Sequence, residues 1–343
     1  MNWQNILTTP ASAFDERGRA VLIPDSCALD CLNSDAVVMP LGHYASLTIS
    51  GPDTHKFLQG QLSCDMQTLT PENALAGALC TPKGRMVSNF YLQYLAADQV
   101  LLLLPSGTLP ATQTTLSKYI VFSKAEMQAE QQWCHLGLVG SQAASLVARL
   151  FGKAPPKRLG CIHAENGSAI CISPQQHRYL LTLPSTDLAQ QWRDLTEVAK
   201  PVNSNVWDYL DICAGLGFVQ EQTIEMFIPQ MLNLQLTDGV SFTKGCYTGQ
   251  EIVARTEYRG NLKRRMYRAT ASANAVPEPG TAIFSSAKEQ PVGNIVTAEQ
   301  AATDGVEMLI VAALSESREE SLHLSDKQGP HLQLLDLPYS FAD

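Results

Sequence analysis

The sequence predicts an α+β protein of several domains that ends in a small β-barrel or sandwich. Strand patterns and helix patterns follow one another through the first three quarters of the chain. Beyond Met266 the pattern changes to short strands separated by turns rich in Gly, Pro and Asp. The length of 343 residues is sufficient for two to three domains, each with a core of its own.

The first part of the chain is expected to consist of strands with two helices. Residues 44–49 alternate between apolar and polar positions, as a strand does. Pro52 suits the first position of a short helix, which Gly60 would end. The further elements that we expect here are strands at 74–80, 86–95 and 99–104 and a helix at 109–120.

A second α+β region is predicted from Leu136 onward, with a Pro-rich break at 154–157. Residues 207–214 have the pattern of a helix, and the short strands of the C-terminal part follow Met266. From these changes we place three portions at 1–135, 136–261 and 262–343.

Composition narrows the functional class. The first residues lack the basic and apolar regions of a signal peptide, and the longest strongly apolar run, Val100 to Leu104, is too short to span a membrane. Nine cysteines are scattered without a C-x-x-C pair, which is typical of a reduced, cytoplasmic protein. Cys27 and Cys31 have no second pair nearby and the histidines are dispersed, so we expect no protein-bound metal.

A formal net charge of −9 argues against a protein that wraps nucleic acid. One basic cluster is an exception, and Glu257 alone opposes it: Arg255, Arg259, Lys263, Arg264, Arg265 and Arg268. These cations either belong to a solvated helix end and strand edge or form a binding site for an anion.

Residues 244–251, Lys-Gly-Cys-Tyr-Thr-Gly-Gln-Glu, are called the signature segment below. Thr248 and Glu251 form a capping box, which predicts a helix with Thr248 as its N-cap that stops near Gly260. Cys246 would then lie just before a helix N-terminus with Lys244 two residues away, so its thiolate form should be stabilised. The alternative is a small buried cysteine in an ordinary turn.

The signature segment, together with 227–230 and 233–234, resembles the signature of the YgfZ family, which is named for a folate-binding protein linked to tRNA modification and iron–sulfur enzyme function. Weaker similarities run from about residue 40 to 340, and the supporting segments are 51–62, 83–89, 118–124 and 259–264. YgfZ-like proteins resemble the glycine cleavage T-protein. The resemblance therefore implies a ring of a folate-binding portion, a ferredoxin-like portion and a barrel around a central folate pocket, with the first two portions interleaved.

The resemblance also implies a tetrahydrofolate or other reduced folate as cofactor, and it suggests residues that would hold it. Trp207 matches a family tryptophan implicated in folate binding, and Tyr44 stands where the family can carry another. The residues alone favour a different interpretation, in which Trp207 is a core aromatic at a helix start and Tyr44 is an exposed strand residue. The basic cluster could meet the glutamate tail of the folate or a partner's phosphates. The remaining candidates for the folate site are Tyr247, Gln250, Glu251, Asn89 and Arg255.

Whether the chain is a catalyst depends on Ser88 and Asn89, which stand where the T-protein has an acid. An amide cannot accept a proton at neutral pH, so aminomethyl transfer by that route is unavailable.

Three hypotheses remain. The chain is a tetrahydrofolate-binding accessory protein of iron–sulfur enzymes, with Cys246 in a redox or transfer role; a folate-dependent transferase that uses Asp208 or Glu251; or a cysteine-centred chaperone in which folate is structural. The expected partners are iron–sulfur enzymes or their assembly proteins. We expect a cytoplasmic monomer without membrane contact and, because of its acidic charge, an indirect effect on tRNA.

Overall fold

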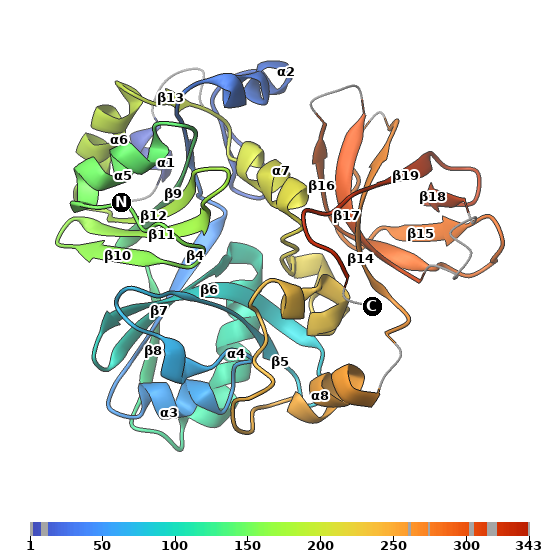
Figure 1. Cartoon of the computed structure of the whole chain (residues 1–343), viewed down its shortest axis with the longest axis horizontal. Coiled ribbons are helices and arrows are strands. Elements are labelled where there is room, and N and C mark those ends of the chain that lie inside the picture. Colours follow the sequence, from blue (N-terminus) through green and yellow to red (C-terminus); the bar gives the residue numbers. More distant parts are fainter. Residues whose placement is uncertain are drawn as a thin grey trace.

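The computed structural model describes residues 3–7, 13–259, 262–273, 275–301, 305–313 and 321–341. In this part of the chain the strands form two open sheets, a closed barrel and a small ribbon of β1 (Ala13–Phe14) and β2 (Ala20–Val21). Figure 1 shows the two open sheets on one side of the molecule and the barrel on the other, with α7 between them.

The first open sheet has five antiparallel strands in the order β5-β6-β7-β4-β8. Helices α3 (Thr54–Gln59) and α4 (Leu109–Ile120) bury Phe57, Leu58 and Leu116 in a core cluster with residues of this sheet. The strands are β4 (Tyr44–Ser50), β5 (Leu75–Cys80), β6 (Met86–Ala96), β7 (Gln99–Pro105) and β8 (Glu126–Glu130), with short 3₁₀ turns at Met66–Thr68 and Ser106–Thr108.

The second open sheet has six strands in the order β10-β11-β12-β9-β3-β13, and only β13 runs parallel to its neighbour. Helices α1 (Trp3–Ile6), α5 (Ala143–Phe151) and α6 (Leu188–Thr196) share a core cluster with it. The strands are β3 (Val37–Pro40), β9 (Trp133–Val139), β10 (Cys161–Ala164), β11 (Gly167–Ser173), β12 (Arg178–Pro184) and β13 (Lys200–Pro201).

The chain crosses between the open sheets within a few residues, because β3 belongs to the six-stranded sheet and β4 to the five-stranded one. Residues from both sheets and from α7 (Asn205–Ala214) form one buried cluster, so the two sheets share a core. The crossing at residues 41–43 therefore lies where the two sheets meet.

The C-terminal part is a closed barrel in the order β14-β17-β16-β15-β18-β19, which confirms the predicted barrel. Its interior is filled by small and branched apolar side chains such as Ala269, Ile295 and Ile310. The strands are β14 (Arg265–Ala271), β15 (Ala282–Ser285), β16 (Gly293–Gln300), β17 (Val306–Ala312), β18 (Leu322–Leu324) and β19 (His331–Leu335).

The segment between α7 and the barrel is mostly irregular and connects the five-stranded sheet to the barrel. Met86 of β6 donates its backbone N–H to Phe227 O over 2.8 Å, and both residues belong to a cluster that includes barrel residues such as Met266. The elements here are 3₁₀ turns at Glu221–Thr223, Pro229–Leu232 and Leu234–Leu236 and helix α8 (Gln250–Arg259); α2 (Asp25–Ala28) and a 3₁₀ turn at Asp30–Asn33 lie near the N-terminus.

The helix predicted to open at Pro52 begins instead at Thr54. Gly51 has a φ of +125°, and the carboxylate of Asp53 accepts the backbone N–H of Lys124, so residues 51–53 form a turn before the helix. The helix predicted after the signature segment was expected to stop near Gly260, which lies outside the described residues. Among the helices of the described part, none is long and apolar enough to cross a membrane.

Candidate functional site

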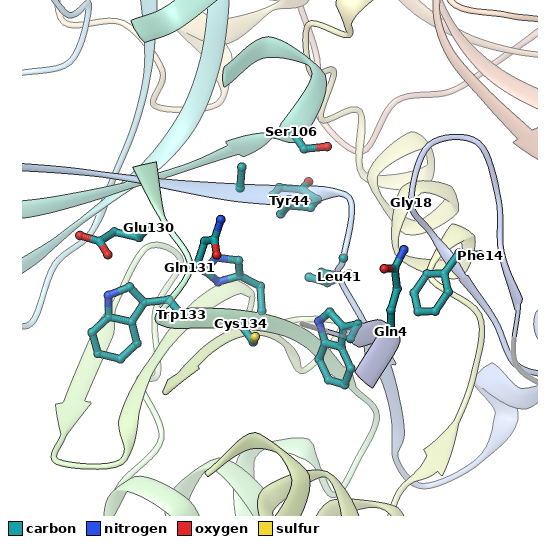
Figure 2. Close-up of a pocket in the computed structure, with 14 residues that line it drawn as sticks. Gln4, Phe14, Gly18, Leu41, Tyr44, Ser106, Glu130, Gln131, Trp133 and Cys134 are labelled. Carbon is teal, nitrogen blue, oxygen red and sulfur yellow. The ribbon is translucent and has the colours of Figure 1, made fainter. Parts of the chain in front are cut away.

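A cleft of about 490 Å³ lies beside the crossing between the two open sheets. The N-terminal segment, the start of β4 and the start of β9 form its walls. Figure 2 shows Tyr44, Leu41, Trp133 and Phe14 around this space. Its aromatic lining residues are Trp3, Phe14, Tyr44 and Trp133, and its polar ones include Gln4, Ser106, Glu130, Gln131 and His135. We call it the Tyr44 cleft.

Tyr44 also borders a second, smaller hollow, which Asp208, Asp211 and Phe218 line. The Tyr44 side chain is buried, and its ring meets Phe218 edge to face at 6.3 Å. Burial, with the nearby Asp211 and Asp208, raises the pKa of the Tyr44 phenol well above its ordinary value. Tyr44 is thus a neutral aromatic wall that the cleft and the hollow share, not an exposed strand residue.

The polar groups of the cleft include a histidine that stays neutral. His135 Nε2 lies 2.6 Å from Ser46 Oγ, and its Nδ1 lies 3.2 Å from Thr182 Oγ1. Burial lowers the pKa of His135 to about 3, so the ring carries no charge at neutral pH. Glu130 is then the only charged group among the described residues that line the cleft.

Trp207 lies in the shared core, with 1 % of its surface exposed. The guanidinium of Arg178 covers its ring at 3.7 Å from the centroid. Gly137 also packs closely against the indole, because a Cβ at Gly137 would stand 2.3 Å from Trp207 Cε3. The indole is therefore enclosed by protein, and it does not line the Tyr44 cleft.

Arg178 pairs with Asp211, one turn after Trp207 on α7. Arg178 Nη2 lies 2.8 Å from Asp211 Oδ1 in an ion pair, and the same nitrogen donates to Trp207 O at 3.0 Å. Arg178 Nε and Nη1 are buried and have no hydrogen-bond partner among the described residues. Burial raises the pKa of Asp211 to about 7 in spite of the cation beside it.

Asp208 faces a different set of charges. Its carboxylate lies 3.1 Å from His43 Nε2 and 3.1 Å from Arg19 Nη1, and Arg19 also pairs with Glu299 of the barrel. Although burial raises its pKa, His43, Arg17 and Arg19 together hold the pKa of Asp208 well below its ordinary value. Asp208 is therefore ionised at neutral pH, and its interactions join α7 to the N-terminal ribbon and the barrel.

Asn89 is engaged through both ends of its amide. Its Nδ2 donates to Gly217 O and its Oδ1 accepts the N–H of Val219, each over 2.8 Å. A carboxylate at this position could accept from Val219 but could not donate to Gly217. Ser88 Oγ accepts from Thr112 Oγ1 at 2.8 Å. Ser88 and Asn89 thus fasten β6 to its neighbours.

Lys244 is buried in the signature segment and donates to three backbone carbonyls. Its Nζ lies 2.8 Å from Gln59 O, 2.7 Å from Leu62 O and 2.7 Å from Cys64 O. An ammonium has three donors, so all of them are directed at the turn that follows α3. Lys244 thus anchors the signature segment, while Cys246 is exposed.

Helix α8 begins at Gln250, so the prediction that Thr248 is its N-cap is wrong. Gly249 has a φ of +85°, which is not helical, and a Cβ there would stand 2.5 Å from Thr81 O. The Thr248 hydroxyl instead donates to Gln61 Oε1 at 3.1 Å. Glycine is therefore required at 249, and it delays the helix.

The predicted site residues fall into two groups. Tyr44, Trp207 and Asn89 surround the junction of the two open sheets with α7. Lys244, Cys246, Tyr247, Gln250, Glu251 and Arg255 belong to the signature segment and α8, and none of them lines the Tyr44 cleft. In Figure 1, α8 lies at the lower right, whereas α1 and β9, which border the cleft, lie at the upper left.

Known proteins resemble this chain in sequence and in fold. Residues 29–169 match the model of the GCVT N-terminal domain. The chain is 34% identical over 310 residues to the tRNA-modifying protein YgfZ of Klebsiella pneumoniae (strain 342). The aligned region covers 89% of this chain and 94% of that protein. The chain belongs to the YgfZ family. The YgfZ protein of Pectobacterium atrosepticum is 32% identical over 314 residues, or 90% of this chain and 93% of that protein.

The YgfZ-family chain shares its architecture with a solved T-protein. The glycine cleavage system aminomethyltransferase T from Bartonella henselae superposes with a TM-score of 0.75 at 16% identity, over 96% of this chain and 94% of that one. The predicted T-protein-like fold is confirmed.

Sequence reasoning on this YgfZ-family chain missed three features: the cleft wall formed by Trp3 and Trp133, the ion pair of Arg178 with Asp211, and neutral His135. Only Asp211 carried a local signal, since it lies four residues after Trp207 and therefore on the same face of the predicted helix.

Proposed function

We propose that this YgfZ-family chain is a tetrahydrofolate-binding accessory protein that supports tRNA modification through iron–sulfur enzymes. The observation that carries the folate part is the aromatic Tyr44 cleft, set at a sheet junction of a T-protein-like fold. The tRNA part rests on the relatives, which are named tRNA-modifying proteins.

The cleft meets the chemical needs of a folate. Tyr44, Trp133 and Trp3 offer flat apolar walls for the pterin and benzoyl rings. Glu130 and Gln131 supply acceptors for the amino and ring N–H groups of the pterin edge. A volume of about 490 Å³ is within the range of pockets that enclose small ligands. Since none of the described residues that line the cleft is a cation, the glutamate tail would extend toward solvent.

The same geometry disfavours aminomethyl transfer by the T-protein route. Asn89 holds two backbone groups and cannot exchange a proton, and Asp208 is ionised within an ion-pair network. Asp211 is the observation that favours the alternative of a folate-dependent transferase, since its pKa is raised to about 7 and it lines the hollow behind Tyr44. Release of a one-carbon product that Asp211→Asn abolishes would establish that alternative.

Cys246 is proposed to serve a redox or transfer role toward a protein partner. Its exposure on the loop before α8 supports this role, and Lys244 fixes that loop. Because the signature segment does not line the Tyr44 cleft, folate binding and the thiol are expected to be separable.

Anaerobic calorimetric titration with tetrahydrofolate tests the proposal. We expect saturable binding that Tyr44→Ala weakens at least about tenfold through loss of the shared aromatic wall, and that Cys246→Ser leaves unchanged. In a deletion strain, Cys246→Ser should fail to restore the activity of iron–sulfur enzymes although it binds folate. Absence of binding by the wild type would overturn the folate proposal, and full rescue by Cys246→Ser would remove the thiol from it.

A further inference from the structure

A second cleft lies between α8 and the barrel, and its charge is opposite to that of the whole chain. It has a volume of about 390 Å³, and its walls come from the β5–β6 turn, residues 226–231, α8 and residues 262–264. Arg85, Lys263 and Arg264 line it, and no Asp or Glu is among its described lining residues. We call it the cationic cleft.

The cations of this cleft are available to a ligand. Lys263 and Arg264 are exposed, and neither takes part in an ion pair among the residues that the structure describes. Arg85 Nη1 donates to Met226 O, which fixes the guanidinium and leaves its other N–H donors available to a ligand. Glu225 is exposed next to Met226 but does not line the cleft. The local charge of the lining is thus about +3, in a chain with a net charge of −9.

The rest of the cleft is apolar. Met226, Met231 and Leu262 are partly buried there, and Phe227, Ile228 and Val311 lie beneath them. A site that joins cations to an apolar floor suits an anion with a hydrophobic body rather than a bare ion. Guanidinium groups bind phosphate through two parallel hydrogen bonds, and methionine adapts its shape to flat or irregular ligands.

We propose that the cationic cleft binds a small phosphate ester with a hydrophobic body, of the size of a nucleoside diphosphate. The cations hold the phosphates and the methionines contact the body. Two phosphates carry two to three negative charges, which Arg85, Lys263 and Arg264 balance. A small ligand fits better than RNA, because the net charge of −9 opposes a broad contact with a phosphate backbone. The site is independent of the Tyr44 cleft, with which it shares no lining residue.

Methyl NMR of the full-length protein, labelled at its methionines, tests this proposal with ADP and inorganic pyrophosphate as probes. Met226→Leu and Met231→Leu assign the two cleft resonances. We expect saturable shifts of these two signals with ADP, and weaker binding of pyrophosphate, which lacks the body. The double variant Lys263→Gln/Arg264→Gln should weaken ADP binding at least about tenfold through loss of two charge-assisted contacts. Its control is Lys118→Gln/Lys124→Gln, which removes the same charge from two exposed lysines elsewhere and should change binding less than about twofold.

Three results would overturn the proposal. One is equal weakening by the two double variants, which would indicate general attraction of anions. Another is ADP-induced shifts confined to methionines outside the cleft. The third is binding of tRNA through these cations with no saturable binding of ADP. Tetrahydrofolate binding serves as the check that the cleft variants are folded, since they should retain it. If the wild type does not bind tetrahydrofolate, that result affects the folate proposal alone.

Discussion

Arg178 lies over the ring of Trp207, with its guanidinium carbon 3.7 Å from the ring centre, and the same side chain pairs with Asp211. Arg178 has no exposed surface, so these two neighbours on α7 take the place of water around its guanidinium. The contact ties the six-stranded sheet to the helix at the centre of the molecule. Trp207 therefore packs between the sheet and α7 and does not itself line the Tyr44 cleft.

Arg178→Met should lower the free energy of unfolding by about 3–5 kcal/mol, because it leaves Asp211 buried without its cation. Urea denaturation followed by circular dichroism measures this change. Arg193→Met, at an exposed arginine of α6, is the matched control and should stay within about 0.5 kcal/mol of wild type. A cost for Arg178→Met no larger than that of the control would show that the buried pair does not stabilise the junction.

Stability should depend on pH through two buried acids. Burial raises the pKa values of Asp211 and Glu299 to about 7 each, above the ordinary values of carboxyl groups in an unfolded chain. Between about pH 4 and pH 7 the folded state then binds more protons than the unfolded state, so these groups destabilise the fold as pH rises. Asp211→Asn should flatten this part of the curve, whereas Glu165→Gln, at an exposed site, should not. An unchanged slope in Asp211→Asn would refute the raised pKa.

Asn89→Asp should destabilise the protein by about 1–3 kcal/mol, because the carboxylate cannot donate to Gly217 O and leaves that buried carbonyl unpaired. It should also not confer aminomethyl transfer, although it places an acid where the T-protein resemblance leads one to expect it. Asn73→Asp is the control for stability, because the hydrogen bond that the Asn73 side-chain amide donates to Thr68 O is exposed. Wild-type stability together with gained transferase activity would contradict the structural role of Asn89.

Lys244→Met should cost about 2–3 kcal/mol, since it removes a charged donor from three carbonyls at once. Lys83→Met, at an exposed lysine in the β5–β6 turn, is the control. Unaltered stability would show that the signature segment does not need this anchor.

Local patterns predicted most elements but not their neighbours. The helix at Leu109–Ile120 and the strand from Tyr44 were predicted because their periodicity and turn residues are local signals. Nothing local indicates that Val37–Pro40 pairs with β9, about a hundred residues later, because sheet partners are chosen by long-range packing.

The site was predictable to a smaller extent for the same reason. The signature segment could be recognised, but its capping pattern gave the wrong helix start because the backbone at Gly249 is set by its contact with Thr81. Likewise, the three carbonyls that bind Lys244 and the cation over Trp207 come from distant parts of the chain. Spacing along the sequence therefore could not reveal them.

The measurement that tests the central claim most directly is the dissociation constant for tetrahydrofolate in two variants placed on opposite sides of Tyr44. Trp133 lines the Tyr44 cleft and not the hollow behind it, whereas Phe218 lines the hollow and not the cleft. If the folate rings occupy the cleft, Trp133→Ala should weaken binding at least about tenfold while Phe218→Leu changes it less than about threefold. The reverse order, or no binding to the wild type, would contradict the assignment of the cleft.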